Sequence, residues 1–578
     1  MKLSIQDNEL GKHLLNDSLI NSRNLDAAMK RATRQGDSLA RSIIDLKFLT
    51  EEVVYQYLAR IRHLEFTRID KNALDQELLG RFPTKMIFHY RCLPVREEKG
   101  QLVIAFSDPP PLSEQGNLRL VLGKRLKIVI TTPGDIQNIL RDHFGIGAEM
   151  VQKLGTESED EESFLSSVHD LENHGVGNVM DASLADFVDQ ILAEALRLRA
   201  TDIHLEPYQK SIRLRYRIDG VLESVPVPDS MRKIYSAVVS RFKILANADI
   251  SERRVPQDGR VSLKSNGREI DLRLSTIPTN YGEGICLRIL GRENLFLELS
   301  DIGLAQNQED TFLQIGELPN GLVLITGPTG SGKTTTLYAL LNRMNNIGRK
   351  IITIEDPVEY QLEGVAQINI RDEIGLTFAR GLRSILRHDP DIILVGEIRD
   401  EETAGISVRA AQTGHMVLST LHTNDSVSAV TRLMEMRVDP HLLGSSLVAS
   451  VAQRLAQKLC QACRRPQTVI PPRVAGEMAT ALNIPEKNLL AWVADGCPEC
   501  QGRGYSGRVG IYEIFIPNEE TVDFIDLSVK AGRLRQHAWQ HGWRPMRHVA
   551  WQKVQDGLIS IAELDRLTRR LQHSTSAD

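Results

Sequence analysis

The stretch that decides the fold is Leu322-Val-Leu-Ile-Thr326 followed by Gly327-Pro-Thr-Gly-Ser-Gly-Lys-Thr334. The second part fits the pattern G-x-x-x-x-G-K-[ST], and helix-forming residues 335–341 follow it directly. An apolar strand, a glycine-rich loop and a helix in this order form a P-loop, whose backbone N–H groups surround phosphates at the start of a helix. We therefore expect the phosphates of ATP to lie against eight consecutive residues: Gly327, Pro328, Thr329, Gly330, Ser331, Gly332, Lys333 and Thr334. Lys333 is expected to reach the β- and γ-phosphates, and the Thr334 hydroxyl to bind Mg²⁺.

Acidic residues end two apolar strands that follow the P-loop. The segment Asp391-Ile-Ile-Leu-Val-Gly-Glu397 is a Walker B candidate, with Gly396 in place of the usual Asp, so Glu397 carries the expected role. The segment Ile351-Ile-Thr-Ile-Glu355-Asp356 also ends in carboxylates. Either Glu397 or Glu355 is the base that orients the attacking water, and these residues leave the choice open.

Two histidines flank a third apolar strand, residues 416–421. In a doubly wound sheet, ligands lie beyond the carboxyl ends of the strands. We therefore expect His422 to converge on the nucleotide with Glu355, Asp356 and Glu397. His415 precedes the strand, and its role stays open between a structural and a functional one.

The 578 residues suggest several domains, and strand and helix signals alternate in the central part of the chain. In the first 63 residues, a faint repeat with a 29-residue offset aligns Leu10, Leu14 and Leu15 with Leu39, Ile43 and Ile44, and predicts two helical hairpins. Residues 102–106, 126–130 and 212–218 are predicted strands, the last with Arg213, Arg215 and Arg217 on one face. The predicted division is an N-terminal docking domain 1–145 (helical repeat 1–63, small α/β unit 64–145), an acidic linker 146–182, a middle α/β domain 183–300, an ATPase domain 301–516 and a helical tail 517–578.

The overall charge argues against a nucleic-acid partner. The chain has 70 Lys and Arg against 75 Asp and Glu, a formal net charge of −5, whereas proteins that grip a phosphate backbone are usually basic. The chain has no apolar run of the roughly 18–20 residues that a membrane span needs, and its first residues lack a signal peptide. Composition therefore indicates a cytosolic protein.

Four of the six cysteines form two CxxC pairs, Cys460 with Cys463 and Cys497 with Cys500, separated by 33 residues. Disulfides are disfavoured in the cytosol, and redox catalysis needs one such pair rather than two. The pattern predicts a tetrahedral four-cysteine zinc site in an element spanning residues 460–500.

Four ordered motifs resemble those of the ATPases of type II secretion and type IV pilus assembly. They are the P-loop, Ile354-Glu-Asp-Pro-Val-Glu359, Val395-Gly-Glu-Ile-Arg-Asp400 and Thr413-Gly-His-Met-Val-Leu-Ser-Thr-Leu-His-Thr423, which correspond to Walker A, Asp box, Walker B and His box. Residues 200–207, 217–222 and 254–260 resemble the middle domain of the same family. The resemblance covers residues 183–520 densely and the N-terminus loosely.

The resemblance implies a multidomain α/β protein. Its parts are a RecA-like motor domain, a PAS-like α/β middle domain, a zinc-binding insertion and a mainly helical and α/β N-terminal domain. It also implies a homo-hexamer at the cytoplasmic face of the inner membrane, peripheral to it, which drives a polytopic platform protein and has an inner-membrane recruiting protein as a further partner.

Arginines of the middle domain are candidates for contacting the γ-phosphate. The transition state needs positive charge, the P-loop supplies only Lys333, and its own domain offers no obvious arginine. Arg217, with Arg232 or Arg241, is expected to act from the middle domain.

The N-terminal repeat resembles a helical module that binds cyclic-di-GMP on some of these ATPases. That module's paired R-L-G starts correspond here to Glu9-Leu10-Gly11 and Ser38-Leu39-Ala40, so both arginines and one glycine are missing. Arginine stacks on guanine and forms paired hydrogen bonds with phosphate, which neither Glu nor Ser can do. We expect a docking domain without this ligand.

Two other functions compete with an ATP-hydrolysing assembly motor. One is a nucleic-acid translocase, against which the acidic balance and the lack of interleaved aromatic and basic residues count. The other is a nucleotide-gated adaptor that binds ATP without hydrolysing it, although Lys333, Thr334 and Glu397 are all present.

Overall fold

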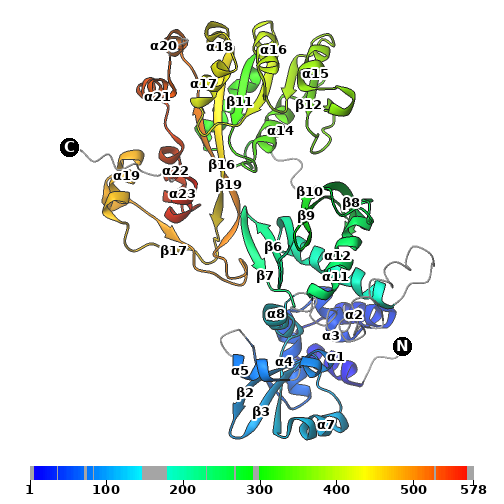
Figure 1. Cartoon of the computed structure of the whole chain (residues 1–578). Coiled ribbons are helices and arrows are strands. Elements are labelled where there is room, and N and C mark those ends of the chain that lie inside the picture. The colour runs from blue at the N-terminus through cyan, green and yellow to red at the C-terminus, as the bar shows by residue number, and fades with distance from the viewer. Residues whose placement is uncertain are drawn as a thin grey trace. The chain divides into compact units, whose positions relative to one another are not determined.

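The structure, a computed structural model, describes residues 5–35, 37–69, 74–82, 84–145, 179–228, 231–265, 268–290, 298–525 and 529–568. The chain forms two compact units, and Figure 1 labels the elements within them. The first unit contains Met1–Arg217, Leu222–Leu263 and Asp271–Ile289, and the second contains Ile218–Val221, Lys264–Ile270 and Leu290–Asp578. The finer five-part division stays a prediction, and nearly all of its acidic linker lies outside the described residues.

The N-terminal repeat folds as four helices: α1 (Ile5–Asn16), α2 (Ser22–Gln35), α3 (Leu39–Asp45) and α4 (Glu51–Ile61). The predicted helical hairpins are confirmed, because Leu10 and Leu14 pack in one core with Leu39 and Ile43. Leu15 is exposed, since it follows Leu14 by about 100° around the helix and so leaves the buried face.

A small α/β part follows the repeat. Its four-stranded sheet has the order β1 (Glu65–Phe66), β4 (Arg125–Ile130), β3 (Gln101–Phe106) and β2 (Cys92–Glu98). Its helices are α5 (Gln76–Arg81), α6 (Thr84–Tyr90), α7 (Leu112–Leu122) and α8 (Pro133–Phe144). The two predicted strands are confirmed as β3 and β4, which run parallel. The Thr132 hydroxyl accepts the Asp135 N–H at 3.0 Å and caps α8.

The rest of the first unit is a six-stranded sheet with two helices. Its order is β7 (Val221–Val225), β6 (Ile212–Ile218), β5 (Ala200–Pro207), β10 (Gly282–Leu290), β9 (Arg268–Thr279) and β8 (Gln257–Ser265), with α11 (Val179–Arg197) and α12 (Met231–Leu245). Leu214 and Tyr216 of β6 are buried, and the Tyr216 hydroxyl donates to the Ile191 carbonyl of α11 at 2.9 Å. The predicted alternation is confirmed, so Arg217 lies on the face of the sheet opposite α11.

The second unit is built on a seven-stranded sheet. Its order is β13 (Val365–Asn369), β12 (Ile351–Glu355), β14 (Ile392–Val395), β15 (Met416–Leu421), β11 (Gly321–Thr326), β16 (Leu447–Leu459) and β19 (Tyr505–Phe515). All neighbouring pairs are parallel except β16 with β19. One strand, β15, separates the P-loop strand β11 from β14, which precedes Glu397, and this is the RecA-like arrangement.

Helices cover both faces of this sheet, as the alternation within β11 shows. Leu322 and Leu324 face one core, and Val323 and Ile325 face the other. The second core contains α13 (Gln306–Glu317) and α14 (Lys333–Met344), and the first contains α15 (Phe378–Ile385), α16 (Glu401–Gln412), α17 (Ser428–Glu435) and α18 (Pro440–Ser446). A short 3₁₀ helix, η3 (Asp372–Ile374), precedes α15. The carboxyl ends of the parallel strands therefore form the edge at which a ligand is expected.

The remaining elements of the second unit follow β16. A two-stranded ribbon of β17 (Arg465–Pro466) and β18 (Trp492–Val493) encloses α19 (Pro472–Leu482) and η4 (Glu486–Asn488) in sequence. The chain ends in α20 (Glu519–Phe524), α21 (Ala531–Gln540), α22 (Met546–Gln555) and α23 (Ile561–Thr568). In the described part of the chain, none of the helices is both long enough and apolar enough to span a membrane.

Candidate functional site

The P-loop joins the buried strand β11 to the start of α14. Gly327 and Gly332 have positive φ angles of 148° and 87°. A Cβ on Gly327 would lie 2.6 Å from the Gln453 carbonyl oxygen, and one on Gly332 would lie 2.8 Å from Gln453 Nε2. Only glycine fits at these two positions, because β16 passes directly behind the loop.

Two polar side chains of the loop fit a phosphate ligand. Lys333 Nζ donates to the carbonyls of Gly327 at 2.9 Å and Pro328 at 3.1 Å, so the ammonium group is held over the loop. Burial lowers the pKa of Lys333. The negative charge of Glu397 raises this pKa, and the positive charge of Arg454 lowers it further. The Ser331 Oγ is buried and has no hydrogen-bond partner among the described residues, as expected of a group that binds a phosphate oxygen.

Glu397 lies just beyond the carboxyl end of β14 and pairs with two side chains. It accepts a hydrogen bond from Arg399 Nη2, and its Oε2 lies 3.4 Å from His422 Nε2. The same Arg399 nitrogen lies 3.3 Å from Asp356 Oδ2. Arg399 therefore joins the Asp box, the Walker B segment and the His box in one charged cluster. Asp356, Glu397 and His422 follow the carboxyl ends of β12, β14 and β15, which is the edge of the sheet where the P-loop follows β11.

Glu355, the fourth predicted group, makes its side-chain hydrogen bonds to residues outside this cluster. It is 3% exposed and accepts hydrogen bonds from Thr353 at 2.6 Å, from Gln367 at 3.4 Å and from Tyr338 of α14. Burial raises the pKa of Glu355, and the three hydrogen bonds oppose that rise. The structure thus brings together three of the four predicted groups, Asp356, Glu397 and His422.

The two histidines of the His box have different surroundings. His422 follows the carboxyl end of β15, whereas His415 precedes its amino end. His415 Nδ1 lies 3.0 Å from the Ala410 carbonyl oxygen of α16. His415 therefore has a local structural contact at the edge of the sheet that is remote from the P-loop.

Arg454 and Gln453 of β16 also adjoin the P-loop, and sequence reasoning missed both. The Gln453 Oε1 accepts the Thr336 hydroxyl at 2.9 Å. Arg454 donates to the carbonyls of Gln453 at 3.1 Å and Asn424 at 3.4 Å, and its Nη1 would lie 3.2 Å from a Cβ on Gly327. The expectation that the motor domain lacks an arginine of its own is therefore corrected, since Arg399 and Arg454 both lie beside the site. The detectable signal was the polar pair Gln453-Arg454 in the middle of a strand whose first half, residues 447–452, is mostly apolar.

The middle-domain arginines fall into separate groups. Arg217 Nε lies 3.4 Å from Asp202 Oδ2, and Arg288 Nε lies 3.0 Å from Asp202 Oδ1. Arg288 was not among the predicted arginines, because its strand β10 lies far from Arg217 in sequence. In the described residues, no contact joins Arg232 or Arg241 to this group.

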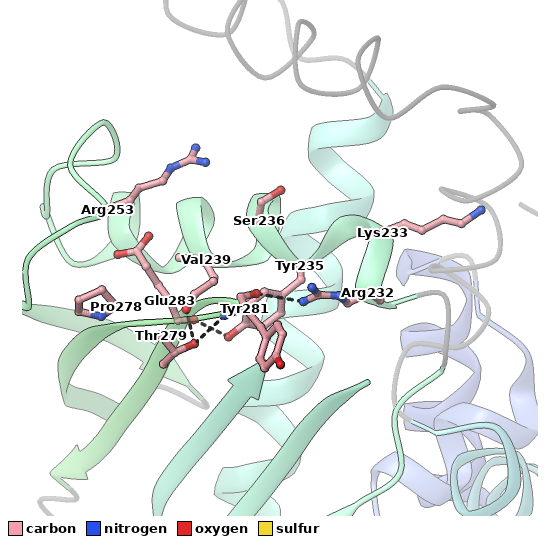
Figure 2. Close-up of a pocket in the computed structure, with 11 residues that line it drawn as sticks. Arg232, Lys233, Tyr235, Ser236, Val239, Arg253, Pro278, Thr279, Tyr281 and Glu283 are labelled. Atoms are coloured by element: carbon pink, nitrogen blue, oxygen red, sulfur yellow. Dashed lines mark hydrogen bonds between the residues drawn. The ribbon is translucent and has the colours of Figure 1, made fainter. Parts of the chain in front are cut away.

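Arg232 instead lines a cavity of about 300 Å³ between α12 and the turn that connects β9 to β10 (Figure 2). Its Nη1 donates to the Tyr281 carbonyl at 3.1 Å. At the floor, the Tyr235 hydroxyl donates to the Glu283 carbonyl at 2.7 Å, and the Glu283 carboxylate pairs with buried Lys243 at 2.5 Å. The P-loop is not part of this cavity.

The four cysteines form one cluster whose spacing fits zinc. Cys460 and Cys497 have sulfurs 3.8 Å apart, as do Cys463 and Cys500, and the sulfurs of Cys497 and Cys500 are 3.7 Å apart. A zinc–sulfur bond of about 2.3 Å gives tetrahedral edges of about 3.8 Å. Burial raises the pKa of the Cys500 thiol, but hydrogen bonds from the backbone N–H groups of Cys497 and Gly504 and contacts with the thiols of Cys497 and Cys463 outweigh it, and the pKa is lowered to about 7. The cluster therefore has the geometry and chemistry of a structural zinc site.

Comparison with known proteins gives matches over nearly the whole chain. Residues 178–566 match the family described as Type II/IV secretion system protein, and residues 62–150 match the MshEN domain. The second match begins after α4, so it covers the small α/β part and not the helical repeat that resembles the cyclic-di-GMP module.

The relatives include pilus assembly and secretion ATPases. The type IV pilus assembly ATPase PilB of Myxococcus xanthus is 35% identical over 563 residues, which cover 96% of this chain and 98% of that protein. The type II secretion system ATPase E of Vibrio cholerae is 40% identical over 424 residues, which cover 73% of this chain and 82% of that protein. Among solved structures, the pilus retraction motor PilT with bound ADP is 26% identical with a TM-score of 0.43, and the match covers 66% of this chain and 95% of that chain. A family match over more than half of the chain, with a relative aligned over almost its full length, places this chain in the type II/IV secretion system protein family, as one of its ATPases.

Proposed function

We propose that this chain is the ATP-hydrolysing motor that powers the assembly of a type IV pilus or of a type II secretion pseudopilus. The observation that carries the proposal is the cluster of Glu397, Arg399, His422 and Asp356 beside a P-loop whose Lys333 is already positioned. This arrangement offers phosphate binding, charge stabilisation and a carboxylate for water in one place, which phosphoryl transfer to water requires.

The residues of the site take separate roles in this proposal. When ATP binds, Lys333 Nζ leaves the carbonyls of Gly327 and Pro328 and donates to phosphate oxygens instead. The Ser331 hydroxyl donates to a phosphate oxygen. The Thr334 hydroxyl would bind Mg²⁺, which would supply a Lewis acid that withdraws charge from the phosphate oxygens. Glu397 orients the attacking water, and His422 holds the position of that carboxylate.

Arg217 supplies positive charge to the γ-phosphate of a neighbouring copy. Positive charge in the transition state is worth several orders of magnitude in phosphoryl transfer. The chain acts as a homo-hexamer, and its partners are a polytopic platform protein and a recruiting protein. It works in the cytoplasm, at the inner membrane.

Lys333→Ala and Glu397→Gln test the proposal because the first should affect nucleotide binding and the second should affect turnover. Lys333→Ala should weaken nucleotide binding about tenfold or more, since a hydrogen bond from a charged donor is lost. Glu397→Gln should bind ATP within about twofold of the native affinity and lose about a hundredfold in turnover, since only the charge that orients water is removed. Calorimetric titration with ADP and a steady-state phosphate-release assay measure the two effects.

Two outcomes would count against these roles. Native turnover in Glu397→Gln would move the role of base to Glu355. A native chain that binds ATP without releasing phosphate would instead support a nucleotide-gated adaptor.

A further inference from the structure

Glu513 is a buried carboxylate of the second unit that the nucleotide site does not use. It lies on β19 opposite Ala452 of β16 and is 2% exposed. Its Oε1 accepts both the backbone N–H and the hydroxyl of Ser426, each at 2.7 Å, and its Oε2 accepts the backbone N–H of Met546 at 2.7 Å. A buried carboxylate needs such donors, because it has lost the hydrogen bonds that water would give it.

On one side, Glu513 holds the loop that connects β15 to α17. Ser426 belongs to this loop, as does Thr423, whose N–H donates to the Thr326 hydroxyl at 2.9 Å. The two threonine hydroxyls are also 2.6 Å apart, and Thr326 directly precedes Gly327 of the P-loop. The loop is therefore hydrogen-bonded to the base of the P-loop at one end and to Glu513 at the other.

On its other side, Glu513 holds the C-terminal helices. Met546 is the first residue of α22, and its N–H is one of those that a helix leaves unpaired at its start. A carboxylate at this end of a helix is also stabilised by the helix dipole. The indole N–H of Trp543, between α21 and α22, donates to the Ser426 hydroxyl at 2.9 Å, so the same serine and glutamate join both helices to the loop.

The carboxylate of Glu513 also acts on Arg454, the arginine of β16 that adjoins the P-loop. Burial lowers the pKa of Arg454, and the negative charges of Glu513 and Asp425 raise it. Arg454 donates to the Asn424 carbonyl of the same loop. A shift of the loop would thus change both its hydrogen bonds and the electrostatic surroundings of Arg454.

We infer that Glu513 is a positioning residue that couples the nucleotide at the P-loop to the C-terminal helices α21 and α22. When Lys333 leaves the Gly327 carbonyl for a phosphate, the preceding residue Thr326 and its hydrogen-bonded partner Thr423 move with it. Glu513 carries the displacement of that loop to the start of α22. The inference rests on the proposed hydrolysis of ATP and adds a route by which the nucleotide controls a distant surface of the chain.

Glu513→Gln tests the inference in the full chain. The glutamine amide has nearly the same volume as the carboxylate, but its NH₂ group cannot accept hydrogen bonds from both Ser426 and Met546. The measurements are steady-state hydrolysis of ATP and hydrogen exchange of the backbone in residues 541–550, with and without a non-hydrolysable ATP analogue and Mg²⁺. In the native chain the analogue should slow exchange of this segment. In Glu513→Gln this response should disappear and kcat should fall about tenfold, with a change in KM for ATP below about twofold.

Glu563→Gln is the matched control. Glu563 is 3% exposed and accepts the Gln457 N–H of β16 at 2.7 Å, but it does not contact the loop. This variant should keep the nucleotide response and most of the turnover. If Glu513→Gln does not fold, Ser426→Ala replaces it, because this change removes one hydroxyl and keeps the carboxylate. In Ser426→Ala the analogue should slow hydrogen exchange of residues 541–550 less than it does in the native chain.

Three results would overturn the inference. They are a native nucleotide response in Glu513→Gln, an equal loss of turnover in Glu563→Gln, and a native chain that hydrolyses ATP without any slowing of exchange in residues 541–550. A native chain without hydrolysis would contradict the proposed function instead, so the two failures are distinguishable.

Discussion

Two carboxylates at the ends of the neighbouring strands β12 and β14 have opposite surroundings. Glu397 is partly exposed and pairs with Arg399 and His422, whereas Glu355 is buried among neutral donors and its pKa is raised by that burial. A raised pKa suits a base that must exchange a proton near neutral pH. The pH dependence of hydrolysis can therefore show whether Glu355 or Glu397 is the base.

Tyr338→Phe should move the pH dependence of hydrolysis only if Glu355 is the base. The Tyr338 hydroxyl donates to the Glu355 carboxylate, and this hydrogen bond lowers the pKa of Glu355 against the effect of burial. Its removal raises that pKa further, so a larger fraction of Glu355 is protonated at a given pH. The acidic limb of the kcat profile should then shift to higher pH.

Tyr360→Phe provides the comparison for this experiment. The Tyr360 ring packs 4.6 Å from that of Tyr338, and its hydroxyl makes no hydrogen bond to Glu355 in the described residues. This change should leave the acidic limb in place. An unmoved limb in both variants would assign the base to Glu397.

At the scale of elements, the four-cysteine cluster holds the segment between β16 and β19 together. Apart from its cysteines, the segment has only Ala475, Met478 and Ala491 as buried apolar residues in the part that the structure describes, so the metal supplies much of its stability. We expect about one zinc per chain by metal analysis of the purified protein. Zinc-free protein that is reduced and folded would contradict the site.

Cys460→Ser should unfold this segment and leave the P-loop intact. The variant should show increased proteolysis between residues 460 and 500, with a change in affinity for ADP below about threefold. Cys92→Ser offers a comparison at a buried cysteine outside the cluster. A large loss of ADP binding in Cys460→Ser alone would mean that the cluster also shapes the nucleotide site.

The N-terminal repeat should not bind cyclic-di-GMP tightly. The Leu39 N–H at the start of α3 donates to Asp7 at 2.9 Å, and the Ser38 hydroxyl accepts the Arg41 N–H at 3.2 Å, so an acidic group and a cap already occupy this helix start. Placing a like charge where an arginine would contact phosphate costs on the order of 10²–10⁴ in affinity. Calorimetric titration of the full chain should give no dissociation constant near or below about micromolar; such a value would make the motor a target of this second messenger.

At the scale of the whole molecule, the prediction concerns assembly. We expect a hexamer with nucleotide bound, measured by light scattering, because Arg217 is proposed to serve a neighbouring copy. Arg217→Ala should reduce turnover about tenfold or more and largely spare ADP binding, since the guanidinium acts on the γ-phosphate.

Arg213→Ala is the matched change on the same strand and face. The Arg213 guanidinium lies 4.7 Å from the centre of the Tyr208 ring and pairs with no carboxylate among the described residues. This variant should turn over ATP normally. A monomer with full turnover would contradict the proposed assembly.

The sequence by itself determined the P-loop, the strand ends that carry Glu397 and His422, the four-cysteine cluster and the helical repeat. These are local patterns, in which spacing along the chain fixes which backbone or side-chain groups lie together. It also fixed the exposed face of β6 that carries Arg217, because strand side chains alternate with period two.

Only the tertiary structure decided how residues from distant strands share this site. Glu355 and Glu397 both follow apolar stretches, and only the tertiary structure brings the Tyr338 hydroxyl of α14 to Glu355 while Glu397 pairs with Arg399 and His422. Arg454 and Glu513 reach the P-loop and its neighbouring loop because β16 lies next to β11, with β19 beyond it. Strand order places these side chains together, and strand order depends on contacts between residues far apart in sequence, which no local pattern records.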